Sequence, residues 1–137
     1  MEPHVVWADD PALPSGGSLT AFHGTDIESA HTLLQGEPLN VEKAAAHKID
    51  GPPGFFLATE VDDAIFFALR RAPGGVLAYH LSLHAVEQLQ AAGMLRRQIP
   101  PGKTIRFIGD EIVIPPEAFT VFNGLREAGE IFVTPAL

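Results

Sequence analysis

Apolar residues recur at helical spacing in two segments of the chain. The first follows the sequence TDIE at Thr25–Glu28, which has the spacing of a capping box, and it should end near Gly36. In the second, apolar positions at i, i+3, i+4, i+7 and i+8 predict a helix over Val61–Arg71. Thr59 and Asp62 have the N-cap spacing for this second helix.

Short apolar runs bounded by Gly, Pro and Asp predict the strands, and one more helix lies between two of them. We expect strands at Ser18–Phe22, Phe55–Ala58, Val76–Leu83, Thr104–Ile108, Glu111–Ile114, Phe119–Phe122 and Ile131–Val133, and a short helix at Val86–Ala92. Residues 1–17 are expected to be an irregular lead-in, and residues 36–50 a loop with a helical turn. Because sustained βαβ alternation is missing, the order predicts a single small α+β domain over residues 18–137.

Composition narrows the classes of function. A chain of 137 residues with 46% hydrophobic content can bury one core without disulfides or metals. The absence of cysteine excludes thiolate metal sites and a cysteine nucleophile. The net charge is −8, with 17 acidic and 9 basic residues, so nucleic acid is an unlikely partner. We expect a cytoplasmic protein without a membrane segment, since no signal peptide or long apolar run is recognisable.

The histidines do not suggest a metal site. His80 and His84 have the i, i+4 spacing of ligands on a helix, but the surrounding sequence VLAYHLSLH is typical of a strand. Four residues of a strand span about 13 Å, which is too far for one ion. No GxGxxG or Walker A motif occurs, so a nucleotide would have to be held in another way.

Three segments stand out for their chemistry and their order: FHGT at Phe22–Thr25, GFFLATEVDDAIFFA at Gly54–Ala68, and GDEIVIPP at Gly109–Pro116. Together they resemble the ADP-ribosyltransferase superfamily, in its diphtheria-toxin and poly-ADP-ribose-polymerase branch with a His-Tyr/Phe-Glu triad. The resemblance spans roughly two thirds of the chain. It implies a split mixed β-sheet flanked by short helices, with NAD as the bound substrate.

The resemblance also implies a role for each matching residue of the first two segments. His23 would donate to ribose hydroxyls of NAD, the backbone of Gly24 would pair with the nicotinamide carboxamide, and Thr25 would support that backbone. Phe56 falls where the family usually has a tyrosine against the nicotinamide ring. Phe67 falls where a second aromatic residue flanks the ring, which suits the binding of a flat heteroaromatic group.

Glu111 takes the place of the catalytic glutamate, and residues Met94–Asp110 that of the loop that meets the acceptor. A carboxylate there would stabilise the positive charge that develops when nicotinamide leaves. Two positions depart from the family. Phe56 lacks the tyrosine hydroxyl, and Ala64 stands where many members have a serine that binds the carboxamide.

The resemblance implies an NAD-dependent ADP-ribosyltransferase or NAD glycohydrolase. Many members of this family are toxins or effectors, so the expected partners are an unknown macromolecular acceptor and an antitoxin or immunity protein. Two alternatives stay open: a catalytically inactive module that binds NAD or ADP-ribose, and an RNA 2'-phosphotransferase-like enzyme. Structural interpretations also stay open. His23 would then be a strand-end histidine, Phe56 and Phe67 core residues, and Glu111 a charge protecting an edge strand.

Overall fold

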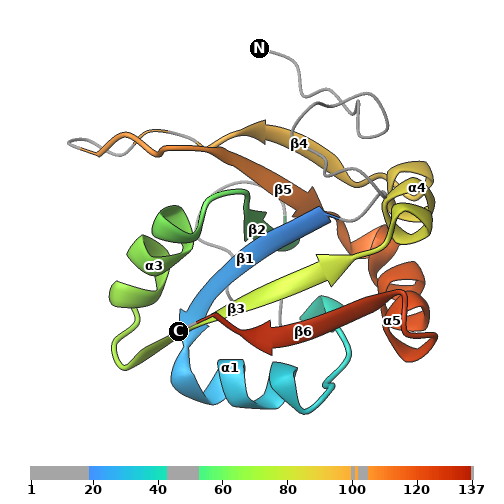
Figure 1. The fold of residues 1–137 in the computed structure, drawn as a ribbon, viewed down its shortest axis with the longest axis horizontal. Coiled ribbons are helices and arrows are strands. Elements are labelled where there is room, and N and C mark those ends of the chain that lie inside the picture. Colours follow the sequence, from blue (N-terminus) through green and yellow to red (C-terminus); the bar gives the residue numbers. More distant parts are fainter. Residues whose placement is uncertain (1–18, 43–52, 100, 102–104, 137) are drawn as a thin grey trace.

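Six strands form one antiparallel sheet in the computed structural model, which describes residues 19–42, 53–99, 101 and 105–136 (Figure 1). The strand order is β4-β5-β2-β1-β3-β6. The strands are β1 (Leu19–Asp26), β2 (Phe55–Ala58), β3 (Gly74–Leu81), β4 (Leu95–Gln98), β5 (Asp110–Ile114) and β6 (Ile131–Pro135). The predicted lead-in 1–17 lies outside the described residues. The α+β class is confirmed.

The family resemblance implied a mixed sheet, but the observed sheet is antiparallel. Every strand pair of the described residues is antiparallel, including both neighbours of β1, namely β2 and β3. A helix lies between β1 and β2 in the chain, and another lies between β2 and β3. Neither connection produces parallel neighbours, because β1 and β2 are antiparallel and β2 and β3 are not adjacent in the sheet. The expectation of a mixed sheet was therefore wrong.

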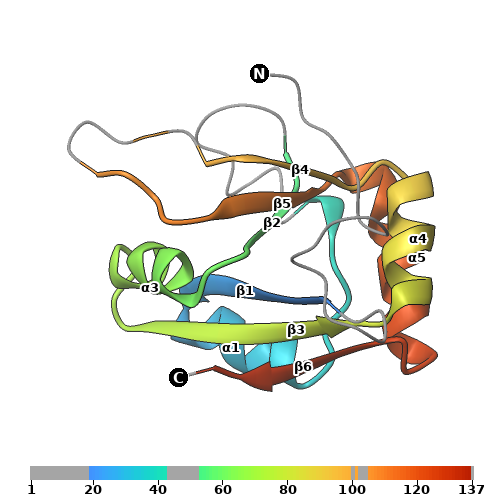
Figure 2. The same cartoon turned by 45° about the horizontal axis from the view of Figure 1, so that its top comes forward.

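The sheet consists of two three-stranded halves that share one partnered pair of residues. β1 and β2 are in register only at Phe22 and Ala58. In contrast, β1 and β3 remain paired from Leu19 to Asp26. Figure 2 shows the halves β4-β5-β2 and β1-β3-β6 as two layers. Residues near Phe22 and Ala58 therefore lie where the two halves meet.

Helices cover both faces of this sheet. They are α1 (Ile27–Leu34), α3 (Val61–Leu69), α4 (Leu83–Ala91) and α5 (Phe119–Glu127), with a 3₁₀ turn η1 (Pro116–Ala118) before α5. Buried residues of α1, α4 and α5 join the larger hydrophobic core, whereas α3 packs on a smaller core with β1, β2 and β3. Among the described residues no helix has the length and apolar character required to cross a membrane.

The close packing of α3 on β1 depends on Gly24. A Cβ atom at this position would clash with the backbone carbonyl of Ala64 in α3. Ala64 and Ala68 are buried on the helix face that meets the sheet. Small residues on both elements thus let the helix approach the strand closely, which fixes the position of α3 beside β1 and β2.

Two predicted strands were wrong, and one strand was missed. Residues 119–122 begin helix α5, because Phe119, Phe122 and Leu125 are buried at helical spacing. Of the predicted strand Thr104–Ile108, residues 105–108 are not in a strand, and Thr104 lies outside the described residues. Strand β4 lies inside the region predicted as loop, Met94–Asp110. Its polar sequence LRRQ gives no apolar strand signal.

The helix starts also differ from the predicted caps. β1 continues to Asp26 because Thr25 and Asp26 stay paired with β3, so Asp26 caps α1 and accepts from the Ser29 N–H at 2.8 Å. Thr25 is therefore not the N-cap, and His23 lies within β1 and not at its end. Helix α3 has Glu60 at its N-cap position without a side-chain cap, so the predicted Thr59 cap was wrong too.

The predicted boundary between β3 and α4 is shifted. The strand ends at Leu81 and Ser82 caps the helix, accepting from the Ala85 N–H at 3.0 Å. Consequently His84 lies in α4 and not in a strand with His80.

Candidate active site

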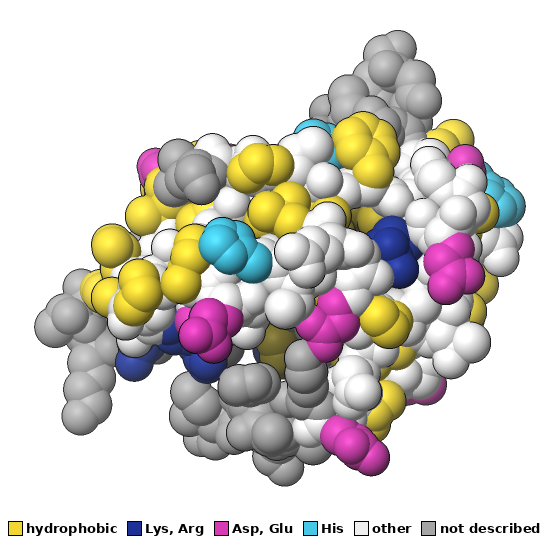
Figure 3. Space-filling model, turned by 90° about the horizontal axis from the view of Figure 1, so that it is seen from below, with side chains coloured by type: hydrophobic (Ala, Val, Ile, Leu, Met, Phe, Trp, Pro, Cys, Tyr) yellow, Lys and Arg dark blue, Asp and Glu magenta, His cyan; other side chains and the backbone are white. Residues whose placement is uncertain are grey.

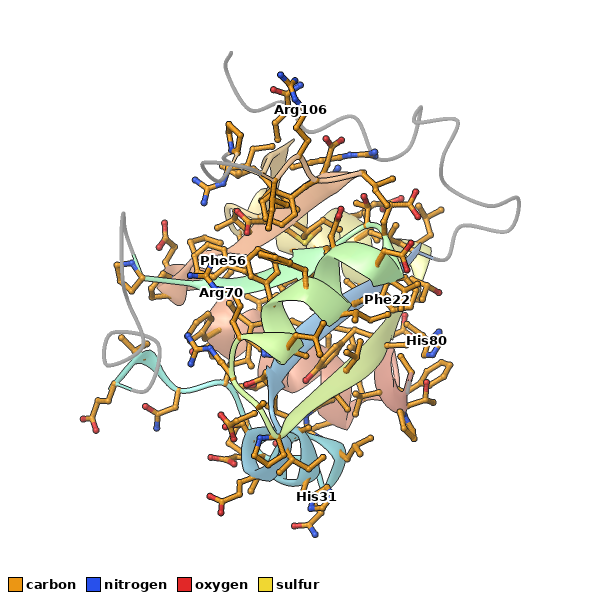
Figure 4. The ribbon with its side chains drawn as sticks, turned by 90° about the vertical axis from the view of Figure 1, so that its left-hand side faces the viewer. Phe22, His31, Phe56, Arg70, His80 and Arg106 are labelled. Carbon is orange, nitrogen blue, oxygen red and sulfur yellow. The ribbon has the colours of Figure 1, made fainter. Side chains whose placement is uncertain are left out.

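The residues predicted to bind NAD lie on four elements around the meeting point of the two half-sheets. They are His23, Gly24 and Thr25 on β1, Phe56 on β2, Phe67 on α3 and Glu111 on β5. Register connects three of these strands, since Phe22 partners Ala58 and Ala58 partners Glu111. In Figure 4, Phe22 and Phe56 appear on opposite sides of α3. The topology thus brings the three sequence segments together.

His23 bridges the two half-sheets next to their shared pair. Its Nδ1 lies 2.8 Å from the backbone oxygen of Phe56, and its ring centroid lies 4.3 Å from that of Phe55. Because a carbonyl oxygen only accepts, Nδ1 must carry the proton. Removal from water, the largest effect, lowers the pKa of His23 to about 4. Near neutral pH, Nε2 is then an unprotonated acceptor, and not the donor to ribose hydroxyls that the resemblance implies.

Gly24 and Thr25 both have structural roles in the chain without a ligand. The clash of a Cβ at position 24 with Ala64 accounts for glycine there through helix packing alone. Thr25 is 8% exposed, and its hydroxyl donates to the Asp26 carboxylate at 3.5 Å. These contacts account for the residue type at both positions, and the backbone of Gly24 is what could hold a carboxamide.

Glu111 is a buried carboxylate held by an arginine. It is 8% exposed, and Arg97 places both Nε and Nη2 at 2.9 Å from the same oxygen, Oε1. Burial raises the pKa of Glu111, and the hydrogen bond and charge of Arg97 act in the opposite direction. Within the described part of the chain, Oε2 has no hydrogen-bond partner. Because β5 lies between β4 and β2, the interpretation of Glu111 as an edge-strand charge was wrong.

Arg97 also contacts Phe56, so one guanidinium connects two predicted site residues. Its Cζ lies 5.8 Å from the Phe56 ring centroid, within cation–π range. The neighbouring residue Arg96 binds Asp110, with Nε 2.7 Å from Oδ2. The sequence analysis missed Arg97. The available signal was the pair Arg96-Arg97 preceding the acidic pair Asp110-Glu111, a pattern expected of two antiparallel strands.

Phe67 stacks on a different aromatic residue from the one expected. Its ring lies 5.3 Å from Phe107, with an interplanar angle of 14°, and Phe66 contacts both rings edge-on. A flat ring between two others would separate their centres by about 7 Å, twice a van der Waals contact. Nothing can therefore lie between Phe67 and Phe107 here, and no ring contact joins Phe67 to Phe56 among the described residues.

The segment that leads into Glu111 is fastened to the start of α3. The carboxylate of Asp63, which is 3% exposed, accepts from the backbone N–H groups of Ile108 at 2.9 Å and Gly109 at 2.8 Å. Thr59 accepts from the Asp110 N–H through its hydroxyl at 2.9 Å and donates its own N–H to the Asp110 carbonyl at 2.9 Å. These bonds determine where β5, and with it Glu111, begins.

His80, one of the two histidines predicted not to bind metal, has other partners. His80 lies between two hydroxyls, 3.2 Å from Thr20 Oγ1 and 2.9 Å from Thr134 Oγ1, and its ring stacks on Phe132. No group of three or more potential metal ligands occurs within the described ranges.

Comparison with protein-family models, with curated proteins and with solved structures found no match.

Proposed function

We propose that the protein cleaves the nicotinamide–ribose bond of NAD, as an ADP-ribosyltransferase or an NAD glycohydrolase, with Glu111 as its catalytic carboxylate. One observation carries this proposal. Glu111 is buried in an interior strand, Arg97 binds one of its oxygens, and Oε2 has no partner among the described residues. Burial disfavours the ionised form of a carboxylate, and buried carboxylates with a shifted pKa are typical of active sites.

The chemistry needs an anion at this position. Nicotinamide leaves with the electron pair of the glycosidic bond, which neutralises its pyridinium nitrogen and leaves positive charge on the ribose ring. A fixed carboxylate stabilises this oxocarbenium-like state more than the ground state. A nucleophile, either water or a group on an acceptor, then bonds to the anomeric carbon and releases a proton.

The other residues would bind NAD and not react with it. The unprotonated Nε2 of His23 is suited to accept a hydrogen bond from a ribose hydroxyl, because Nδ1–H is committed to Phe56. The backbone of Gly24 would hold the carboxamide, and the partly buried ring of Phe56 would stack on nicotinamide. Phe107 already stacks on one face of Phe67, so the proposal rests on Phe56.

A second candidate, a module of the same fold that binds NAD or ADP-ribose without cleaving it, is favoured by the partners of Glu111 and Phe67. Arg97 already compensates the charge of Glu111, and Phe107 already covers Phe67. In such a module, NAD would bind and no nicotinamide would be released. A transferase, in contrast, requires an acceptor, and a toxin of this type would also have an antitoxin or immunity partner.

The test is nicotinamide release from NAD by the wild-type protein and by Glu111→Gln, each with and without a cell extract as a source of acceptors. We expect the substitution to lower release by about 100-fold or more, because it removes the anion at nearly constant volume. Glu87→Gln, on the exposed side of α4, is the matched control and should release nicotinamide at the wild-type rate.

Stimulation by the extract would identify a transferase, and release without it a glycohydrolase. Wild-type turnover retained in Glu111→Gln would remove Glu111 from the mechanism. If no variant releases nicotinamide but calorimetry detects NAD or ADP-ribose binding, the binding module is the better description.

A further inference from the structure

We propose that Arg97 is a positioning residue of this site: it holds Glu111 by Oε1 and so presents Oε2, ionised, to the substrate. This inference rests on the proposed function, and it concerns a residue that lies outside all three segments of the family resemblance.

The sheet register places Arg97 directly opposite Glu111. The two residues are partners in the pairing of β4 with β5, so their side chains leave the same face of the sheet. Two guanidinium nitrogens then reach one carboxylate oxygen at 2.9 Å each. This arrangement restricts rotation of the carboxylate without occupying Oε2. A fork that bound both oxygens would instead have used an acceptor site on each of them.

Arg97 is itself held in place by a second contact. Its guanidinium lies over the Phe56 ring, with Cζ 5.8 Å from the ring centroid. The arginine therefore touches both the carboxylate and the aromatic residue that the proposed function assigns to nicotinamide. Replacing it should change the geometry and the charge state of Glu111 before it changes the fold, because its side chain is 34% exposed.

The charged groups around Glu111 leave Arg97 as its counter-ion. Asp110, on the same strand, pairs with Arg96 of β4, and Asp63, on α3, binds the Ile108 and Gly109 N–H groups. Burial pushes the pKa of Glu111 upward, and Arg97 is the group that opposes this change. Loss of the guanidinium should therefore raise the pKa of Glu111 further.

The experiment compares the pH dependence of nicotinamide release for wild type, Arg97→Met and Arg97→Lys. Because the reaction needs ionised Glu111, activity falls on the acid side as the carboxylate is protonated. We expect Arg97→Met to move this acid limb to higher pH and to lower kcat about 10-fold or more near pH 6, with KM for NAD changed much less. Arg97→Lys, which keeps the charge, should return the limb towards its wild-type position.

Arg70→Met is the matched control. Arg70 makes the same type of contact with a ring, its Cζ being 5.8 Å from the Phe66 centroid, but it is exposed and binds no carboxylate of the site. Its pH profile should superimpose on the wild-type profile. If Arg97→Met does not fold, as judged by urea unfolding, Arg97→Gln carries the test, since it keeps a hydrogen-bond donor and loses only the charge.

The outcomes separate the two proposals. If the wild type is active and the uncharged variants keep its acid limb in the pH profile, the role of Arg97 is overturned and the proposed function is not. This holds even if the rates of the variants fall, because a merely structural role lowers rates without moving the acid limb. A wild type that releases no nicotinamide at any pH overturns the proposed function, and the role of Arg97 within it.

Discussion

At the scale of single residues, His23 couples the stability of the protein to pH. Its pKa is about 4 in the folded protein and about 6.5 when the ring is free in water. Between these values the unfolded chain binds a proton that the folded chain does not. The contribution of His23 to stability is therefore complete above pH 6.5, declines as the pH falls, and is lost below pH 4.

We predict that His23→Asn reduces this loss of stability in acid. Asparagine can donate an N–H to the Phe56 carbonyl but does not titrate, so the wild type should lose up to about 3 kcal/mol more than the variant between pH 7 and pH 4. The measurement is the free energy of unfolding in urea at several pH values. If the free energy of unfolding changed equally with pH in the two proteins, the pKa of His23 would not be lowered in the folded protein.

Glu111 and Asp26 also titrate in acid, but both are present in the two proteins and cancel in the difference. The pKa of Glu111 is raised by burial, so its protonation favours the folded state as the pH falls. The pKa of Asp26 is lowered, chiefly by the Ser29 backbone N–H, so its contribution declines below about pH 3.8 and is lost as the pH falls through the lower pKa of the folded state.

At the scale of elements, Asp63 connects helix α3 to the start of strand β5. Its two carboxylate oxygens accept from two consecutive backbone N–H groups, those of Ile108 and Gly109. Asparagine has one acceptor oxygen, and its NH₂ group would face a donor. We predict that Asp63→Asn lowers the free energy of unfolding by about 1–3 kcal/mol, because a buried N–H loses its partner.

Amide hydrogen exchange in the same variant tests whether Asp63 holds the start of β5 in place. Amide hydrogen exchange at Ile108 and Gly109 should accelerate in Asp63→Asn. Asp62→Asn is the matched control, since Asp62 is the exposed neighbour on the same turn of α3. An Asp63→Asn protein as stable as the control would mean that the two hydrogen bonds hold the segment only weakly.

Elements with a clear apolar period could be predicted from the sequence. Features that depend on contacts with residues distant in the sequence could not. Helix α3 and strand β5 follow from apolar spacing alone, and the structure confirms them within two residues at each end. Residues 119–122 were predicted as a strand because four residues are too few to show a helical period. The period becomes visible only when the buried residue Leu125 is included. Thr59 has cap chemistry, but its hydroxyl is used by Asp110, a partner remote in sequence.

The sequence placed the candidate residues on strands and a helix, but it did not reveal the contacts that these residues make. His23, Phe56 and Glu111 lie on neighbouring strands, β1, β2 and β5, and His23 reaches the Phe56 backbone oxygen while its ring packs on Phe55. The sequence could not show that Arg97 lies opposite Glu111, since β4 has no apolar alternation to reveal it. Nor could it show that Phe107 covers Phe67, because contacts between a loop and a helix leave no periodic signal.

At the scale of the whole molecule, the charge distribution bears on the RNA alternative. The net charge is −8, and Arg96 and Arg97 both bind carboxylates of β5. Figure 3 shows acidic side chains spread over the face seen from below, with basic ones in small, separate groups. Arg106 extends outward at the margin of the molecule in Figure 4 and is exposed. On the face shown in Figure 3, the described residues thus form no continuous basic surface.

We predict that the protein does not bind a short RNA carrying a 2'-phosphate. Affinity for a polyanion comes largely from lysines and arginines that displace counterions, and a surface of net negative charge repels the phosphates. Fluorescence anisotropy of a labelled oligonucleotide should not change up to about 100 μM protein at about 150 mM salt, where basic proteins bind even non-specific nucleic acid at about 1–100 μM. The same oligonucleotide without the 2'-phosphate serves as the control. Saturable binding that requires the 2'-phosphate and weakens as salt is added would instead favour an RNA 2'-phosphotransferase over NAD cleavage.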